Sequence, residues 1–120
     1  MPTMRSALPS LVADLEASLS RLGDSQLASR LADQEVESRA SFGAHFTQIE
    51  LRPGAPVEPV LPLRPAGSMR CLYLPIRGGS AVVLFDEELR ALGLEVTGRA
   101  DLFDSLARAG VRSSSRLPFG

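Results

Sequence analysis

The spacing of the apolar residues changes about one third of the way along the chain, and this change constrains the fold most. Up to residue 22 the apolar residues recur at steps of three and four, which is the period of one buried helix face. This stripe consists of Leu8, Leu11, Val12, Leu15, Leu19 and Leu22. From residue 45 onward the apolar residues alternate or form short runs between proline and glycine turns, as strands do. The sequence therefore predicts helices followed by strands.

Two helices are expected in the N-terminal third. The first begins with Ser10 as N-cap or with Pro9 in its first turn, and Gly23 ends it because glycine adopts the left-handed conformation without strain. Asp24 or Ser25 can then cap a second helix, whose thinner apolar face extends to about Arg39. The two segments form either a helical hairpin or one long kinked helix.

The later runs predict a small, mostly antiparallel sheet. His45–Leu51 alternates as a strand does, and Met69–Ile76 and Ser80–Phe85 flank a glycine-rich hairpin turn. Residues 57–63 contain two prolines, which cannot donate to a ladder, so this segment is either an edge strand or an extended loop.

The last third of the chain leaves one element open. Residues 86–92 fit either a tight turn that leads into a strand at 91–96 or one short helical turn. Asp101 can cap a final helix, and Gly110 is its expected end. Residues 113–120 are typical of a loose tail.

These elements predict one α+β domain spanning residues 1–120, since a chain of 120 residues usually forms a single domain. An N-terminal helix or helical hairpin precedes the sheet, and a C-terminal helix packs on one sheet face. The expected parts are a helical segment at 1–40, a β-sheet region at 45–97, a helix at 100–110 and a tail at 113–120.

The side chains available for chemistry are few. There is no lysine, one histidine (His45) and one cysteine (Cys71), and all 13 basic residues are arginine. Without lysine there is no Schiff-base nucleophile and no P-loop lysine, and one histidine with one cysteine cannot close a His/Cys metal cage. A single cysteine excludes an internal disulfide and fits a reducing compartment. We therefore expect no metal, no cofactor and a non-enzymatic, cytoplasmic protein.

The charge distribution favours a protein partner over nucleic acid. The net charge is −1, whereas a nucleic-acid footprint normally needs a basic excess. A DNA-binding regulator with a helix-turn-helix at residues 21–43 is one alternative, but the acids at 33–37 would face phosphates there. No run approaches 18 apolar residues, so no membrane span is expected.

A hydrolase-type enzyme is the second alternative. His45 and Cys71 would serve as base and nucleophile, or the carboxylates at 86–88 would act. However, Cys71 lies in an alternating run, where cysteine behaves as a small hydrophobe, and the acidic run suits a solvated turn. The segment 77–80, Arg-Gly-Gly-Ser, precedes a strand and not a helix, so it predicts a hairpin and not a phosphate-binding loop.

Three stretches carry a resemblance to a known family: Gln48–Gly54, Ala81–Arg90 and Ala91–Val96. They correspond to a strand ending in Ile-Glu-Leu-Arg, an aliphatic strand with an acidic turn, and a closing strand. Over residues 46–103 the chain thereby resembles the small bacterial domain family of unknown function DUF2283. The resemblance implies a small β-sheet domain, in some cases found beside toxin–antitoxin genes, with no established active site.

Two surfaces are predicted to contact other chains. Guanidinium forks fit carboxylate and phosphate partners in bidentate geometry, so the middle of the chain offers the predicted partner-binding residues. These are Arg52, Arg64, Arg70 and Arg77. The leucine stripe either covers the sheet or forms the interface of a homodimer, which we expect. Its interface residues would be Leu8, Leu11, Leu15, Leu19 and Leu22. The predicted function is a bacterial interaction or regulatory protein, of an accessory or antitoxin-like kind, that binds another protein.

Overall fold

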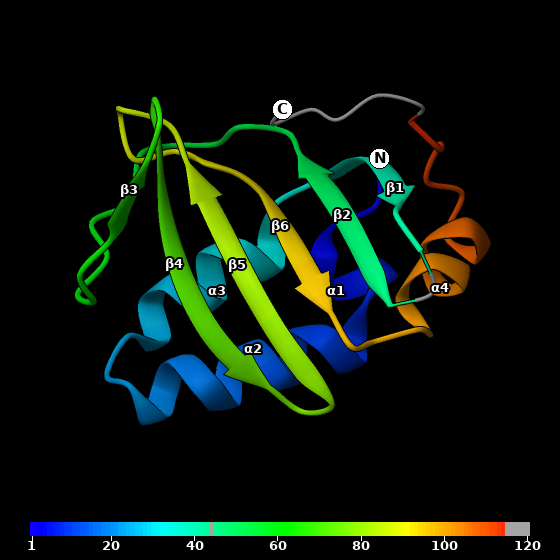
Figure 1. Ribbon diagram of the computed structural model, residues 1–120, viewed down its shortest axis with the longest axis horizontal. Coiled ribbons are helices and arrows are strands. Elements are labelled where there is room, and N and C mark those ends of the chain that lie inside the picture. Colours follow the sequence, from blue (N-terminus) through cyan, green and yellow to red (C-terminus); the bar gives the residue numbers. More distant parts are fainter. Residues whose placement is uncertain (44, 115–120) are drawn as a thin grey trace.

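The computed structural model describes residues 1–43 and 45–114, and it has an α+β fold (Figure 1). Three helices precede six strands, and a fourth helix follows them. The helices are α1 (Met4–Ala7), α2 (Pro9–Arg21), α3 (Ser25–Asp33) and α4 (Leu102–Arg108). The strands are β1 (Val36–Ser41), β2 (Phe46–Leu51), β3 (Arg64–Ala66), β4 (Met69–Ile76), β5 (Gly79–Phe85) and β6 (Ala91–Thr97).

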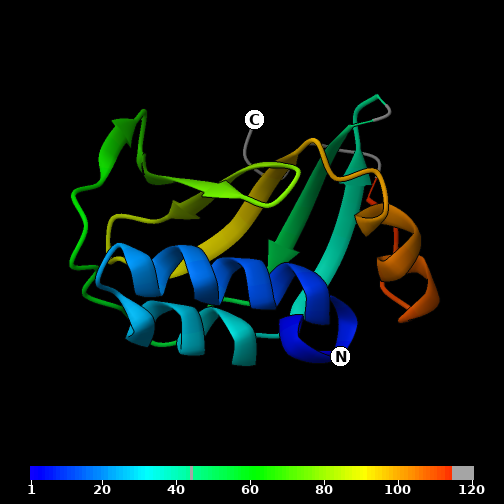
Figure 2. The same cartoon turned by 90° about the horizontal axis from the view of Figure 1, so that it is seen from below.

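The molecule has two layers, with α1, α2 and α3 beneath one face of the sheet (Figure 2). One apolar core fills the space between the layers and extends to α4, which lies beside β1. Among its largest fully buried side chains are Met4, Leu11, Leu15, Leu19, Ile49, Phe85 and Leu94. None of the helices in the described residues is long and apolar enough to cross a membrane.

The first two long helices form a hairpin, one of the two predicted arrangements. Pro9 lies in the first turn of α2, where its missing N–H leaves no intrahelical bond unmade. After α2, Gly23 has φ +92°, and the N–H groups of Gly23 and Asp24 close the last turn at 3.2 and 2.7 Å. Asp24 then caps α3 by accepting the Leu27 N–H at 3.2 Å.

The prediction that the second helix continues to about Arg39 is wrong. The helix α3 ends at Asp33, and strand β1 occupies the end of the segment that was expected to be helical. Gln34 is extended, with ψ 140°, and its side-chain amide donates to two distant backbone carbonyls at 3.0 and 2.7 Å. The Val36 N–H donates to the Pro2 carbonyl at 2.8 Å. These long-range hydrogen bonds fix an extended backbone where local spacing favoured a helix.

The six strands form one sheet in the order β1-β2-β6-β5-β4-β3, and every neighbouring pair is antiparallel. The predicted antiparallel sheet is therefore present. Strand β6 lies in the middle: Leu94 pairs with Ile49 of β2 on one side and with Val83 of β5 on the other. All three side chains are fully buried, which makes this the centre of the helix-covered face.

The predicted hairpin between β4 and β5 is also present, with Arg77 and Gly78 in its turn. Its tip packs against the end of β6. A Cβ at Gly79 would lie 1.8 Å from the Thr97 carbonyl oxygen, so only glycine allows this approach.

The remaining connections settle the open alternatives. Residues 57–63 form an extended loop, and the N–H of Val60 donates to Asp24 Oδ2 at 2.8 Å. The chain turns at Gly67 and Ser68, after Arg64–Ala66 forms the short edge strand β3. The acidic segment before β6 is a tight turn and not a helix. In it, Leu89 adopts φ +64°.

Helix α4 lies in the predicted place, but Asp101 does not cap it. The Asp101 side chain makes no capping hydrogen bond and instead accepts from Arg99 Nε at 3.1 Å, because a guanidinium is the stronger partner. Part of the predicted loose tail is bound: Ser113 forms a parallel bridge with Arg39 of β1. The rest of the predicted tail, residues 115–120, lies outside the described residues.

Candidate functional site

The turn of the β4–β5 hairpin lies near α2 (Figures 1 and 2), and a groove runs between the side chains of the two. One hollow, of about 400 Å³, is lined by Asp14, Ser18 and Arg21 of α2 and by Ile76 and Arg77 at the end of β4. A second hollow, of about 470 Å³, shares Asp14 and Arg77 with the first and is also lined by Ser10 and Arg99. We call the two hollows together the arginine groove.

Arg99 holds the walls of the arginine groove in place. Its side chain is 11% exposed and donates to the Asp14 carboxylate, to Ser10 Oγ at 2.6 Å, to Asp101 Oδ1 at 3.1 Å and to the Arg77 carbonyl at 3.2 Å. The hydrogen bond to Asp101 raises the pKa of Arg99 above its ordinary value and lowers the pKa of the Asp101 carboxyl. One buried guanidinium therefore fastens α2 to the hairpin turn and to the segment before α4.

The other two guanidiniums of the groove are unpaired. Arg21, the last residue of α2, and Arg77, in the hairpin turn, are both exposed. Among residues 1–43 and 45–114, no carboxylate or carbonyl accepts from either side chain, whereas Arg99 holds two carboxylates. Three guanidiniums and two carboxylates leave the groove with one net positive charge.

Ser18 adds a third unpaired group. It lines the first hollow and is only 4% exposed, and its hydroxyl has no hydrogen-bond partner in the described part of the chain. Buried hydroxyl groups are nearly always hydrogen-bonded, since an unmade bond costs about 1–3 kcal/mol. The Ser18 hydroxyl is therefore a buried polar group beside the hollow whose hydrogen bond is not made within the described residues.

The chemistry of the groove is that of anion binding. The hydroxyl of Ser18 and the guanidiniums of Arg21 and Arg77 all donate hydrogen bonds, and arginine forks match the oxygens of carboxylate and phosphate. The one carboxylate that lines the groove, Asp14, is neutralised by Arg99. The arrangement therefore offers hydrogen-bond donors and positive charge to a ligand.

The structure does not bring the four predicted arginines together. Arg64 and Arg70 lie on the neighbouring strands β3 and β4, and Arg52 follows β2, 3.9 Å from Glu35. Arg77 lies at the opposite end of β4 from Arg70, about 23 Å away at about 3.3 Å per residue. Of the four, only Arg77 lines the arginine groove.

Four of the five leucines predicted to form a dimer interface are buried within the chain itself. Leu8, Leu11, Leu15 and Leu19 are at most 2% exposed, because they pack within the chain's own core. Leu22 alone remains accessible, at 42%. The stripe therefore covers the sheet, which is the other use that the sequence allowed.

His45 and Cys71 do not meet. Cys71 lies on β4 and His45 directly precedes β2, three inter-strand steps away, or roughly 14 Å at about 4.8 Å per step. Burial, and then the charge of Glu95, raises the pKa of the Cys71 thiol. Within residues 1–43 and 45–114, no group of three or more histidine, cysteine or acidic side chains could hold a metal ion.

Two further segments have structural roles. The segment after α3, where a helix-turn-helix would place its recognition helix, is strand β1. In the acidic turn, Asp86 accepts from the Arg90 N–H at 2.9 Å and from Arg90 Nε at 2.8 Å. Partial burial opposes ionisation of Asp86, but these hydrogen bonds outweigh it and lower the pKa of its carboxyl.

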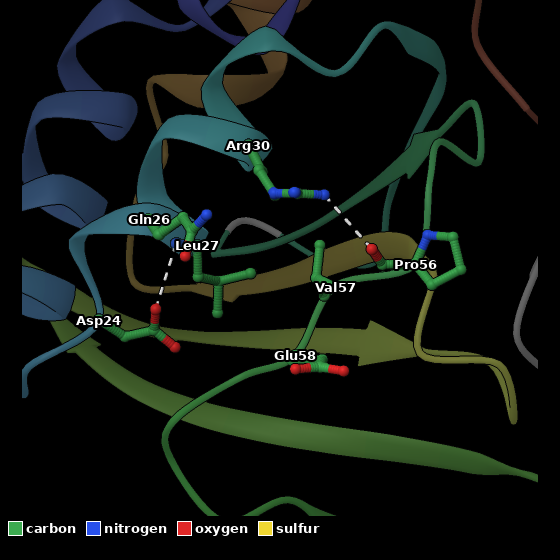
Figure 3. Close-up of a pocket in the computed structure, with 7 residues that line it drawn as sticks. All are labelled: Asp24, Gln26, Leu27, Arg30, Pro56, Val57 and Glu58. Atoms are coloured by element: carbon green, nitrogen blue, oxygen red, sulfur yellow. Dashed lines mark hydrogen bonds between the residues drawn. The ribbon is translucent and has the colours of Figure 1, made fainter.

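A third hollow, of about 320 Å³, lies between the start of α3 and the extended loop (Figure 3). Two of its charged side chains, Asp24 and Arg30, already have partners in the chain. Both oxygens of Asp24 accept backbone N–H groups, from Leu27 and Val60, and Arg30 donates to the Pro56 carbonyl at 3.3 Å. This hollow lies where the extended loop is fastened to α3. It offers a ligand fewer unpaired arginine side chains than the arginine groove does.

Sequence reasoning missed Ser18 and Arg21. Ser18 follows Leu15 by three residues and precedes Leu22 by four, so it interrupts the apolar stripe at a position that faces the core. A polar residue at such a position is a signal for a buried polar contact. Arg21 carries no comparable signal, because a cation in the last helical turn is explained by the helix dipole.

Comparison with known protein families finds none that matches the chain, and searches of curated proteins and of solved structures find no match either. The resemblance of residues 46–103 to DUF2283 therefore stays a prediction.

Proposed function

We propose that this chain is a non-enzymatic bacterial interaction protein that binds another protein through the arginine groove. One observation carries the proposal: the unpaired guanidiniums of Arg21 and Arg77 flank a hollow in which the Ser18 hydroxyl also has no partner within the described residues. Arginine is enriched at protein interfaces, where a partner supplies the acceptors that the free chain lacks.

Two observations on Cys71 support the proposal. The first favours binding over catalysis, and the second favours a reducing location. The raised pKa of the buried Cys71 keeps it a thiol, which is neither a good nucleophile nor a good metal ligand. A free thiol also suits the cytoplasm, where we place the chain. The DUF2283 resemblance adds an accessory or antitoxin-like role to the proposal. The groove is complete within one chain, so the proposal needs no homodimer.

Retention of a partner on the immobilised chain tests the proposal. Arg21→Ala and Arg77→Ala should each lose a protein that the unchanged chain retains from cells in which it occurs naturally. Arg70→Ala removes the same charge at the other end of β4 and should retain that protein. Equal retention by all three variants would contradict the proposal.

A photo-crosslinking residue then locates the contact. At Ala17, an exposed position of α2 that lines the groove, it should crosslink to the retained protein. At Ser29, an exposed position of α3 outside the groove, it should not. Crosslinking of equal yield at the two positions would place the contact elsewhere.

A further inference from the structure

We infer that the arginine groove recognises the carboxylate groups of a short, extended, acidic segment of the partner. The inference rests on the proposed function and adds the chemical class of the ligand. It follows from the kind of unpaired groups in the groove, from their net charge and from the length of the groove.

The unpaired groups select an anion. Ser18 and Arg21 are three residues apart on α2, so they lie on the same side of the helix. Arg77 lines the same hollow from the hairpin turn. A carboxylate has two oxygens with about four acceptor sites, enough to accept from both guanidiniums.

The charge of the groove favours a carboxylate over a phosphate monoester. One net positive charge balances one carboxylate, whereas a phosphate monoester carries −1.5 to −2 at about pH 7. The surplus negative charge would lie near the Asp14 carboxylate. It would also lie at the C-terminal end of α2, where Arg21 is the last residue and the helix dipole is negative.

The shape of the groove favours an extended segment. From Ser10 to Arg21 it follows α2 over roughly 16 Å at about 1.5 Å per residue. At about 3.4 Å per residue, this length accommodates about five residues of an extended chain. Ala17, Pro75 and Ile76 form an apolar wall beside the polar groups. One acidic side chain flanked by aliphatic side chains would therefore fit both kinds of lining.

Fluorescence anisotropy of labelled pentapeptides on the full chain tests the inference. The probe is Val-Val-Glu-Val-Val amide, compared with the same peptide carrying glutamine or phosphoserine in place of glutamate. The glutamate peptide should bind saturably and lose affinity as salt rises. The glutamine peptide should bind at least tenfold more weakly, and the phosphoserine peptide no more tightly than the glutamate peptide.

Three variants assign the contacts. Arg77→Gln should weaken binding of the glutamate peptide about tenfold or more, while Arg70→Gln, of the same charge change, should leave it unchanged. Arg21→Gln should also weaken binding about tenfold without lowering the thermal unfolding midpoint, because the Arg21 side chain is exposed and has no partner in the described residues. A purely structural role of Arg21 would lower the midpoint instead.

Each opposite result overturns the inference. Equal affinity for the glutamate and glutamine peptides would show that the groove does not recognise a carboxylate. Tighter binding of the phosphoserine peptide would show that the groove recognises phosphate instead. No saturable binding at millimolar peptide would exclude both. The crosslink from Ala17 does not depend on peptide chemistry, so it separates these results from failure of the proposed function.

Discussion

Asp101 stands at the start of α4, yet its carboxylate binds the Arg99 guanidinium and not a backbone N–H of the helix. Its position was predictable from the sequence, but its partner was not, because Arg99 reaches it only when α2 and the hairpin turn hold that side chain in place. At the scale of residues, the sequence therefore predicts that a carboxylate stands at the start of the helix. Whether that carboxylate binds a backbone N–H or a guanidinium depends on the folded chain.

Stability should decrease in acid through two carboxyls with lowered pKa values, Asp86 and Asp101. Burial of Asp86 opposes its shift, but its Arg90 bonds prevail, and the Arg99 bond lowers the pKa of Asp101. Such a group contributes stability above its unfolded pKa, about 3.9, and loses it as pH falls through the lower folded value. The urea midpoint, measured from pH 6 downward, should therefore fall below about pH 4.

Matched variants isolate these two carboxyls. Asp86→Asn and Asp101→Asn should each be less stable near neutral pH and should each reduce the acid-induced loss of stability. Glu87→Gln, at an exposed position without an ion pair in the described residues, should leave that loss unchanged. If all three variants lost the same stability in acid, other groups would control that loss.

The arginine groove could be predicted only in part. Arg77 was among the arginines expected to contact a partner, because its side chain and its turn are evident in the sequence. Its meeting with Arg21 and Ser18 requires that α2 pass beneath the end of β4, which no local pattern encodes. The anion-binding chemistry of arginine side chains was therefore predictable from residue type, and the place where Arg77 and Arg21 line one hollow was not.

At the scale of elements, β4, β5 and their turn were predictable because local features specify them. Gly78 and Gly79 mark the turn, and continuous apolar runs flank it. Strand β1 was missed because its alternating burial coincides with helical spacing at Val36 and Ala40, four residues apart. The pairing of β1 with β2 decides between the helical and the strand period, and a local sequence pattern does not show that pairing.

Gly79→Ala should destabilise the chain by about 2–3 kcal/mol, the cost of forcing an atom into a filled space. The new Cβ would meet the Thr97 carbonyl, so the hairpin would have to move away from β6. Urea unfolding measures the loss. Gly54→Ala, where a Cβ meets open space, should change stability by less than about 0.5 kcal/mol. Equal effects of the two substitutions would show that the hairpin tip is not closely packed.

At the scale of the whole molecule, the leucine stripe acts within one chain. Leu15→Ala should lower the free energy of unfolding by about 2–5 kcal/mol, since Leu15 is 2% exposed in the core. The same change at Leu22, which is 42% exposed, should cost under about 1 kcal/mol. The unfolding midpoint of the unchanged chain should not depend on protein concentration. A midpoint that rises with concentration would indicate a dimer.

The central place of β6 in the sheet has a consequence for synthesis. As the chain leaves the ribosome, β1 with β2, and β3 with β4 and β5, can form two separate local units, because each pairs with neighbours in sequence. Nothing joins these units before residues 91–97 emerge. Until then the leucines of α2 have no complete sheet to cover, so the nascent chain offers chaperones an apolar helix for most of its translation.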